Sequence, residues 1–312
     1  MEAEIIIAWV GFLMATYSVM GNDAPAQVLG TLIASHPDKK WILWLGSSLL
    51  LVAALVYSWM NYGQGIAFDR LERIDPVPMQ WYYLLGPVGL LVLTRYGVPV
   101  STSFMMLAIF TITADDDVLE SIITKSMLGY GLALLVAFSV WVSLSRIKIK
   151  QGPANMTIWR PLQYLTTGTL WWFWLSHDLA NIAVFLPRQL SVIELIIICV
   201  IMVAALGLIF RESGGRVHKF VFKGEQDMDI RVATLIDAIY ALLLFVFKEW
   251  SNIPMSTTWV FVGLMAGREL GRAVWIAGTM KEAVRSVAIR LGMITFGAVV
   301  SLLLVLAVTL LK

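Results

Sequence analysis

Two short polar stretches follow apolar runs that are long enough to lie in lipid. The first is GNDAPAQVLGT, from Gly21 to Thr31, and the second is SHDLANIAVFLP, from Ser176 to Pro187. They place Asp23 and Asp178 at membrane depth, where an ionised carboxylate is costly unless it is paired. We therefore treat both aspartates as functional candidates and keep a helix cap at the membrane interface as the alternative.

The oxygens near these aspartates suit a small cation such as Na⁺. Asn22 precedes Asp23, and Asn181 follows Asp178 by three residues, so each acid has an amide nearby. Carboxylate and amide oxygens, with main-chain carbonyls freed where a helix breaks, are the hard ligands that such cations prefer. A bound cation would offset the charge of the aspartate and of an incoming anion, which gives a physical basis for symport.

Two hydroxyl-rich motifs could hold that anion. VPVSTS runs from Val98 to Ser103, and IPMSTT runs from Ile253 to Thr258. Proline suits the first turn of a helix, where Ser and Thr can cap free N–H groups or bind a ligand at the positive helix end. A tetrahedral oxyanion such as phosphate would accept these hydrogen bonds and could donate its own protons to a carboxylate. Capping alone is the alternative, which the second copy disfavours. The predicted substrate-binding residues are Ser101, Thr102, Ser103, Ser256, Thr257, Thr258, Asp23 and Asp178.

Two further ionisable residues lie near these motifs in the sequence. Asp237 is inside the apolar run before the second hydroxyl motif, and is either a third cation ligand or a structural acid paired with a hydroxyl. His177 could carry a proton at physiological pH or be merely hydrogen-bonded. The predicted coupling-cation residues are Asn22, Asp23, Asp178, Asn181, Asp237 and His177, with Na⁺ placed at Asp23 and Asp178.

The composition is that of a multi-spanning membrane protein. Apolar residues make up 59% of the 312 residues and charged residues 14%, with a mean hydropathy of +0.80. A soluble domain of this length could not keep that composition in solution. The formal net charge of +2 is too small to argue for a nucleic-acid partner. The single cysteine, Cys199, lies in an apolar run and cannot form an intrachain disulfide.

The apolar runs predict an all-α architecture, because a helix needs about 20 residues to cross roughly 30 Å of hydrocarbon. Ten spans are expected, at about 3–20, 40–61, 79–95, 98–114, 122–145, 159–175, 189–210, 230–250, 253–268 and 287–311. The pieces 22–36 and 177–187 are too short and too polar to cross, so we expect re-entrant or broken segments there. Gly263 and Gly267, four residues apart, should allow close helix packing.

Loop charges give the orientation, because short cytoplasmic loops carry the excess of Lys and Arg. The basic loops are 146–150, 211–223 and 272–285, whereas those at 69–75 and 115–117 are acidic or mixed. With ten spans, the basic loops fall on one side of the membrane and the acidic loops on the other. We predict an integral protein of a prokaryotic inner (cytoplasmic) membrane with both termini outside.

The motifs also indicate an internal repeat. Asp23 and Asp178 are 155 residues apart (178 minus 23), as are Ser101 and Ser256 (256 minus 101). A weaker echo, LVAAL at position 51 and MVAAL at position 202, has an offset of 151. We expect two halves, 1–150 and 151–312, of about five spans and one broken segment each. An odd number of spans inverts the second half, so that the motifs can meet near the midplane from opposite sides.

These residues together resemble the inorganic phosphate transporter (PiT) family, whose members carry duplicated G-A-N-D-V-A-N and P-V-S-T-T-H motifs. Here the first motif reads Gly21, Asn22, Asp23 and later Gly30 and Thr31, and its second copy reads His177, Asp178, Ala180 and Asn181. The segment RPLQYLTTGTLWWFWLSHDLAN is similar to the family's second signature from Gln163 onward, and ALGLIFRESGGRVHKFV resembles the basic loop that follows it. Asp237 sits close to where that family has an acid.

The resemblance implies a symporter of inorganic phosphate driven by Na⁺ or, as the alternative, by H⁺, with no other cofactor. The chain departs from the family pattern at Ala26, His177, Phe104 and Trp259, which bears on the cation sites and on the choice of anion.

Two other functions stay open: a permease for sulfate or a related oxyanion, and a non-transporting receptor or scaffold that has lost its ion sites. An enzyme is not expected, because the sequence has no nucleophile with a base, no metal-ligand cluster and no nucleotide loop. The expected partners are a small inorganic anion and the lipid bilayer, with homodimerisation left open.

Overall fold

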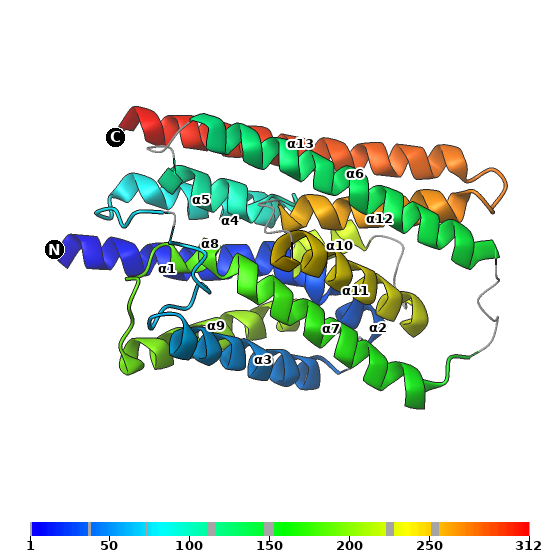
Figure 1. The fold of residues 1–312 in the computed structure, drawn as a ribbon, viewed down its shortest axis with the longest axis horizontal. Coiled ribbons are helices and arrows are strands. Elements are labelled where there is room, and N and C mark those ends of the chain that lie inside the picture. The colour runs from blue at the N-terminus through cyan, green and yellow to red at the C-terminus, as the bar shows by residue number, and fades with distance from the viewer. Residues whose placement is uncertain are drawn as a thin grey trace.

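The computed structural model describes residues 2–36, 39–72, 74–111, 116–146, 153–222, 228–250 and 256–311. The regular elements of these ranges are all helices (Figure 1). In chain order they are α1 (Glu2–Asp23), η1 (Ala24–Val28), α2 (Gly30–Ser35), α3 (Lys40–Asn61), η2 (Trp81–Leu84), α4 (Leu85–Tyr96), α5 (Thr102–Thr111), α6 (Asp116–Arg146), α7 (Met156–Asp178), α8 (Ala180–Ala183), α9 (Val192–Arg211), α10 (Gly215–Val221), α11 (Ile230–Leu244), η3 (Phe245–Trp250), α12 (Thr257–Ala273) and α13 (Met280–Leu311). Parts of the predicted loops and motifs, at 112–115, 147–152, 223–227 and 251–255, lie outside the described residues.

Among the described residues, six helical stretches are long and apolar enough to cross a membrane. They are Glu2–Val28, Lys40–Asn61, Thr124–Leu144, Val192–Arg211, Ile230–Phe247 and Met280–Leu311. Their outer faces are apolar: Leu49, Ile193 and Leu310 are 71%, 71% and 80% exposed. Such a surface is stable against lipid tails but not against water. The prediction of an all-α membrane protein is confirmed.

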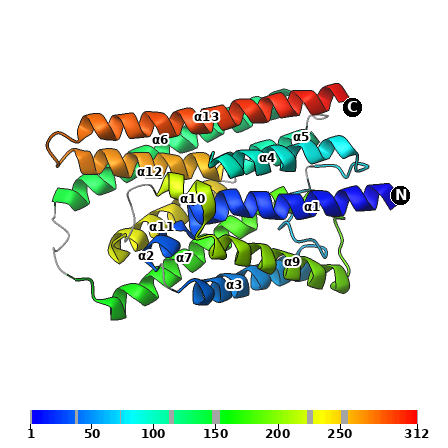
Figure 2. The same cartoon turned by 180° about the vertical axis from the view of Figure 1, so that it is seen from behind.

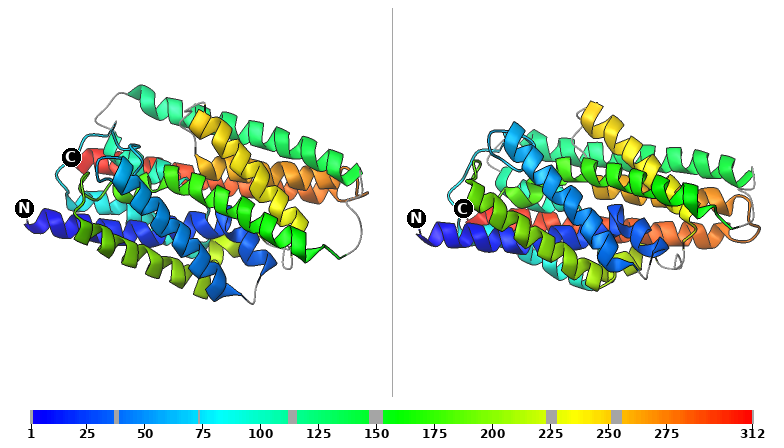
Figure 3. Two further views of the ribbon diagram at one scale, coloured as in Figure 1. Left: turned by 60° about the horizontal axis from the view of Figure 1, so that its bottom comes forward. Right: turned by 90° about the horizontal axis from the view of Figure 1, so that it is seen from below.

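The helices pack side by side along the long axis of the molecule, and both termini lie at the same end (Figures 1 and 2). The turn between α12 and α13 lies at the opposite end. Figure 3 shows α7 running beside α11, and the two are in contact. We call the two ends the termini end and the opposite end.

Two helix pairs enter the bundle from these two ends. α4 and α5 have 12 and 10 residues, about 18 and 15 Å at 1.5 Å per residue, which is too short for either to cross roughly 30 Å. They approach from the termini end, whereas α11 and α12 approach from the opposite end (Figure 1). The helices at the predicted spans 79–95 and 98–114 are therefore not among the six stretches that could cross a membrane by their length. Both helices are apolar because they pack largely against protein, with Leu90, Met105 and Met106 fully buried.

The first and second polar stretches break the helices as expected. α1 continues into the π-helix η1 and the six-residue α2, while α7 ends at Asp178 and is followed by the four-residue α8. The predicted spans at 3–20 and 159–175 are thus the outer parts of α1 and α7, and their inner ends carry the polar residues into the protein.

Close packing of α12 on α6 depends on glycine. A Cβ atom added at Gly263 would lie 2.3 Å from the Tyr130 carbonyl oxygen, and one at Gly267 would lie 2.2 Å from that of Leu134. Gly271 continues this series one turn later against Phe138. The predicted role of Gly263 and Gly267 in helix packing is confirmed.

Two turns with matching backbone follow α3 and α9. Gly63 and Gln64 have φ of 58° and 65°, and Gly214 and Gly215 have φ of 81° and 69°. Their separation is 151 residues (214 minus 63), the offset of the LVAAL and MVAAL echo. The division into two halves at 1–150 and 151–312 stays a prediction, and these turns add a structural observation to the sequence echoes.

Candidate ion-binding site

The ends of four segments meet inside the bundle. The Thr102 hydroxyl, at the start of α5, donates to Asp23 Oδ2 at 2.6 Å at the end of α1. The next hydroxyl, that of Ser103, donates to Asp178 Oδ1 at 3.2 Å at the end of α7. Asp23 and Asp178 are fully buried. The first hydroxyl motif therefore connects Asp23 with Asp178, the two aspartates that occupy equivalent positions in the sequence repeat.

Asn181, in α8, completes this cluster. Its Nδ2 lies 3.2 Å from Thr102 Oγ1, 3.1 Å from Ser103 Oγ and 3.1 Å from Asp178 Oδ1. Its Oδ1 is buried and, among the described residues, receives no hydrogen bond. Because buried carbonyl oxygens nearly always have a partner, this oxygen is suited to a ligand.

The start of α12 reaches the same region from the opposite end. Thr258 donates to the main-chain oxygen of Val100 at 3.0 Å, so the turn before α5 and the start of α12 are in contact. Thr258 Oγ1 also accepts from Gln27 Nε2 at 3.0 Å. The Tyr240 hydroxyl, on α11, lies 3.0 Å from both Gln27 Oε1 and the Thr257 carbonyl oxygen, and these two acceptors share its proton.

Gln27 takes a position in the first half like that of Asn181 in the second. Each amide donates to the third hydroxyl of one motif, Gln27 to Thr258 and Asn181 to Ser103. Asn181 lies three residues after Asp178, whereas Gln27 lies four residues after Asp23. The π-helix η1 accounts for the extra residue, because a π turn holds one more residue than an α turn. The sequence comparison pointed to Ala26 here and so missed Gln27.

Three predicted site residues, Asn22, Ser101 and Ser256, bond to the main chain at the turn before α5 and at the starts of α5 and α12. Asn22 donates to the Val98 carbonyl oxygen and accepts from the Val100 N–H, at 3.0 and 3.1 Å, which fixes the turn before α5. Ser101 Oγ accepts from the Phe104 N–H at 3.3 Å, and Ser256 Oγ accepts from the Trp259 N–H at 3.4 Å. Both serines therefore cap the helices that follow them. For these two serines, the capping alternative describes the observed contact.

Asp237 and His177 are the remaining predicted site residues. Asp237 is fully buried on α11, and its two oxygens accept from the hydroxyls of Thr31, at 2.7 Å, and Thr167. This contact is that of an acid paired with hydroxyls. His177 is 8% exposed at the end of α7. Within the described ranges, no three His, Cys, Asp or Glu side chains gather as a metal-binding group.

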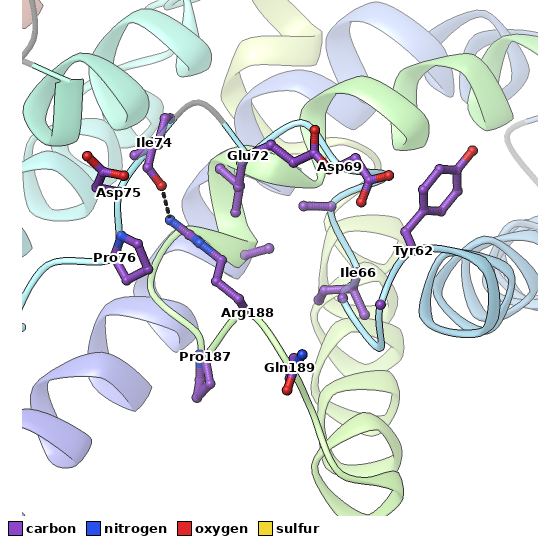
Figure 4. A pocket seen from close by; sticks show the side chains of 15 residues that line it. Tyr62, Ile66, Asp69, Glu72, Ile74, Asp75, Pro76, Pro187, Arg188 and Gln189 are labelled. Atoms are coloured by element: carbon purple, nitrogen blue, oxygen red, sulfur yellow. Dashed lines mark hydrogen bonds between the residues drawn. The ribbon is translucent and has the colours of Figure 1, made fainter.

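A pocket of about 280 Å³ opens at the termini end (Figure 4). Its walls come from the loop after α3, from the loop between α8 and α9, and from Ala183 at the end of α8, two residues after Asn181. Arg188 projects into it and donates from Nη2 to the Ile74 carbonyl oxygen at 3.0 Å. Its Nη1 has no hydrogen-bond partner in the described part of the chain, and burial lowers the pKa of the guanidinium. The acidic residues of the lining are Asp69, Glu72 and Asp75.

Comparison with known proteins finds similarity in the structure but not in the sequence. No family model matches the chain, and no curated protein does. One solved structure, described as "The sodium-dependent phosphate transporter", is 15% identical, with a TM-score of 0.63. The match covers 99% of this chain and 100% of that one.

The chain has the fold of that transporter. At 15% identity the match shows the fold and leaves the substrate and the ion to be argued from the site. The fold expected from the PiT resemblance is thereby confirmed, and the solved structure that shares it is a transporter rather than an enzyme.

Proposed function

We propose that this protein is a secondary transporter that moves an inorganic oxyanion, phosphate foremost, together with Na⁺. The observation that carries the proposal is the link of two buried carboxylates, Asp23 and Asp178, through the hydroxyls of Thr102 and Ser103. Hydroxyls at helix starts suit an anion, carboxylates suit a cation, and here the two kinds of group are in direct contact.

This contact supplies a mechanism of coupling. The Ser103 hydroxyl has one proton, which it donates to Asp178. A cation on Asp178 would neutralise that carboxylate and release the proton of Ser103 for an oxygen of the anion. The anion would then bind beside a site that already carries positive charge. Each ion therefore favours the binding of the other, which is the reciprocal linkage that symport needs.

Neutral donors suit a mid-membrane anion site. The start of α12 brings Thr257 and Thr258, both buried, to the same region as Thr102 and Ser103. Such hydroxyls and helix-start N–H groups can replace the water around phosphate without a fixed positive charge, which would hold the anion too tightly for release.

Alternating access would come from the two halves acting as inverted repeats, with α4–α5 and α11–α12 as the moving pairs. Support comes from their entry at opposite ends of the bundle (Figure 1). The pocket lined by Arg188 opens at the termini end. At α10, by contrast, side chains are packed together: His218 Nε2 lies 3.2 Å from the Gly30 carbonyl oxygen, and the His218 ring stacks on Phe222.

That pocket is the entry route in this proposal. The three acids of the lining would raise the local concentration of Na⁺, and Arg188 would be the cationic group that the anion meets there. Ala183, the last residue of α8, lines the pocket, and Asn181 lies two residues before it in the same helix. Both ions would thus arrive beside the helix that carries Asn181.

The test is uptake of labelled phosphate by proteoliposomes, driven in turn by a Na⁺ gradient and by a H⁺ gradient. We expect uptake with the Na⁺ gradient, collapse when Na⁺ is equalised, and weak competition by sulfate. Uptake driven by H⁺ alone would reassign the coupling ion. Strong inhibition by sulfate with poor phosphate uptake would reassign the anion. No uptake of either anion by folded protein would favour the receptor or scaffold alternative.

A further inference from the structure

We infer that this chain holds one coupling cation, at Asp178 and Asn181, and that Gln27 and Tyr240 close the equivalent position in the first half. The inference rests on the proposed function, because it concerns the cation of that transport. A duplicated fold offers two such positions, and the contacts of the described residues differ between them.

The two positions are built from corresponding groups. The second-half position has the carboxylate of Asp178, the amide of Asn181 and the hydroxyl of Ser103. By correspondence in the repeat, the first-half position has the carboxylate of Asp23, which accepts from Thr102, and the amide of Gln27, which donates to the Thr258 hydroxyl. In both, the amide nitrogen is turned toward the hydroxyl, so the amide oxygen is the group left for a cation.

The orientation of Gln27 is fixed by its neighbours. Thr258 uses its one proton on the Val100 carbonyl oxygen, so it must receive a donor from Gln27. The amide nitrogen therefore faces Thr258 and the amide oxygen faces Tyr240, whose hydroxyl lies 3.0 Å away. The Tyr240 hydroxyl therefore occupies this side of the amide oxygen, and a cation there would have to displace a side chain that is fully buried.

Asn181 has no such closure. It is fully buried, its nitrogen serves Thr102, Ser103 and Asp178, and its Oδ1 receives no hydrogen bond from any described residue. An amide oxygen buried beside a carboxylate, with its lone pairs open, is a ligand set for a small hard cation. A water molecule could also satisfy the oxygen, and the experiment below separates the two.

Direct binding of ²²Na⁺ to detergent-solubilised protein, by equilibrium dialysis without phosphate, tests this inference independently of transport. We expect one Na⁺ per chain. Asn181→Ala should weaken binding at least 10-fold, whereas Gln27→Ala should change it less than 3-fold. Tyr240→Phe, which removes only the closing hydroxyl, should leave the site at Asp178 and Asn181 intact and admit a second Na⁺ at the first-half position.

Three results would overturn the inference. They are two Na⁺ bound by the unmodified chain, no Na⁺ bound, and one Na⁺ that depends on Gln27 rather than on Asn181. Circular dichroism of each variant establishes that it is folded, and Tyr240→Phe provides a second test if Gln27→Ala does not fold. Failure of phosphate uptake with one Na⁺ bound would refute the proposed function and leave the single cation site standing.

Discussion

Replacing Ser103 by alanine should shift the two ion affinities in opposite directions. In the structure, the Ser103 hydroxyl donates to the buried Asp178 carboxylate at 3.2 Å, and a cation must take over that bond. A hydrogen bond to a charged group contributes about 1.5–3 kcal/mol, and a contact of this length belongs at the low end. Without it, Na⁺ should bind up to about 10-fold more tightly in the absence of phosphate.

Phosphate should bind more weakly in the same variant. At saturating Na⁺ the released hydroxyl donates to the anion in the native protein, so its loss costs about 1.5–3 kcal/mol, or roughly 10- to 150-fold in half-saturation. Equilibrium dialysis gives the Na⁺ affinity, and uptake by proteoliposomes gives the phosphate half-saturation. Ser101→Ala is the matched control, since its hydroxyl caps the Phe104 N–H at 3.3 Å and should shift neither affinity by 10-fold.

Ser103→Thr, which keeps the hydroxyl, should restore both values. The reasoning is refuted if Ser103→Ala weakens both ions, because the serine oxygen would then be a cation ligand rather than a competitor for the carboxylate. It is equally refuted if neither affinity changes.

Further substitutions test other parts of the structure. Asp178→Asn should abolish Na⁺-driven uptake without lowering the melting temperature by more than a few degrees, while Glu282→Gln, at an exposed position, should be silent. Ser256→Ala should raise the phosphate half-saturation by less than 10-fold, measured in the same uptake assay, because backbone donors remain. Gly267→Ala should destabilise the protein by about 1–3 kcal/mol in a thermal melt, since its Cβ would lie 2.2 Å from a main-chain oxygen, whereas Gly292→Ala, with open space, should not.

Hydropathy predicted most of the membrane helices because lipid imposes a simple rule on their outer faces. The span expected at 40–61 is α3, Lys40–Asn61, and that at 189–210 is α9 within three residues at its start. The broken segments were also predicted, since Pro25, Gln27 and Asn181 are poor residues for a lipid-facing helix.

Hydropathy could not distinguish α4 and α5 from crossing helices. Buried protein and lipid both favour apolar side chains, so Met105 and Met106 look the same to a hydropathy scale in either setting. Length alone separates them, and the short, largely apolar turn at 97–101 between the two runs did not reveal that the chain reverses there.

The sequence predicted the aspartates and hydroxyls of the site but missed the amide of Gln27 and the phenol of Tyr240. Spacing by 155 residues identified Asp178 from Asp23, but it pointed to Ala26 where the π-helix presents Gln27 instead. Tyr240 carries no sequence signal, because one tyrosine in an apolar run looks like packing. Arg188 was likewise hidden in a loop whose folding onto Ile74 depends on tertiary structure.

The central claim is that cation and anion share one site, and phosphate binding to the purified protein tests it most directly. Affinity for phosphate, measured by calorimetry with and without Na⁺, should rise at least 10-fold with Na⁺ in the native protein and become independent of Na⁺ in Asp178→Asn. Phosphate binding that is indifferent to Na⁺ in the native protein, or that stays dependent on Na⁺ without this carboxylate, would contradict the claim.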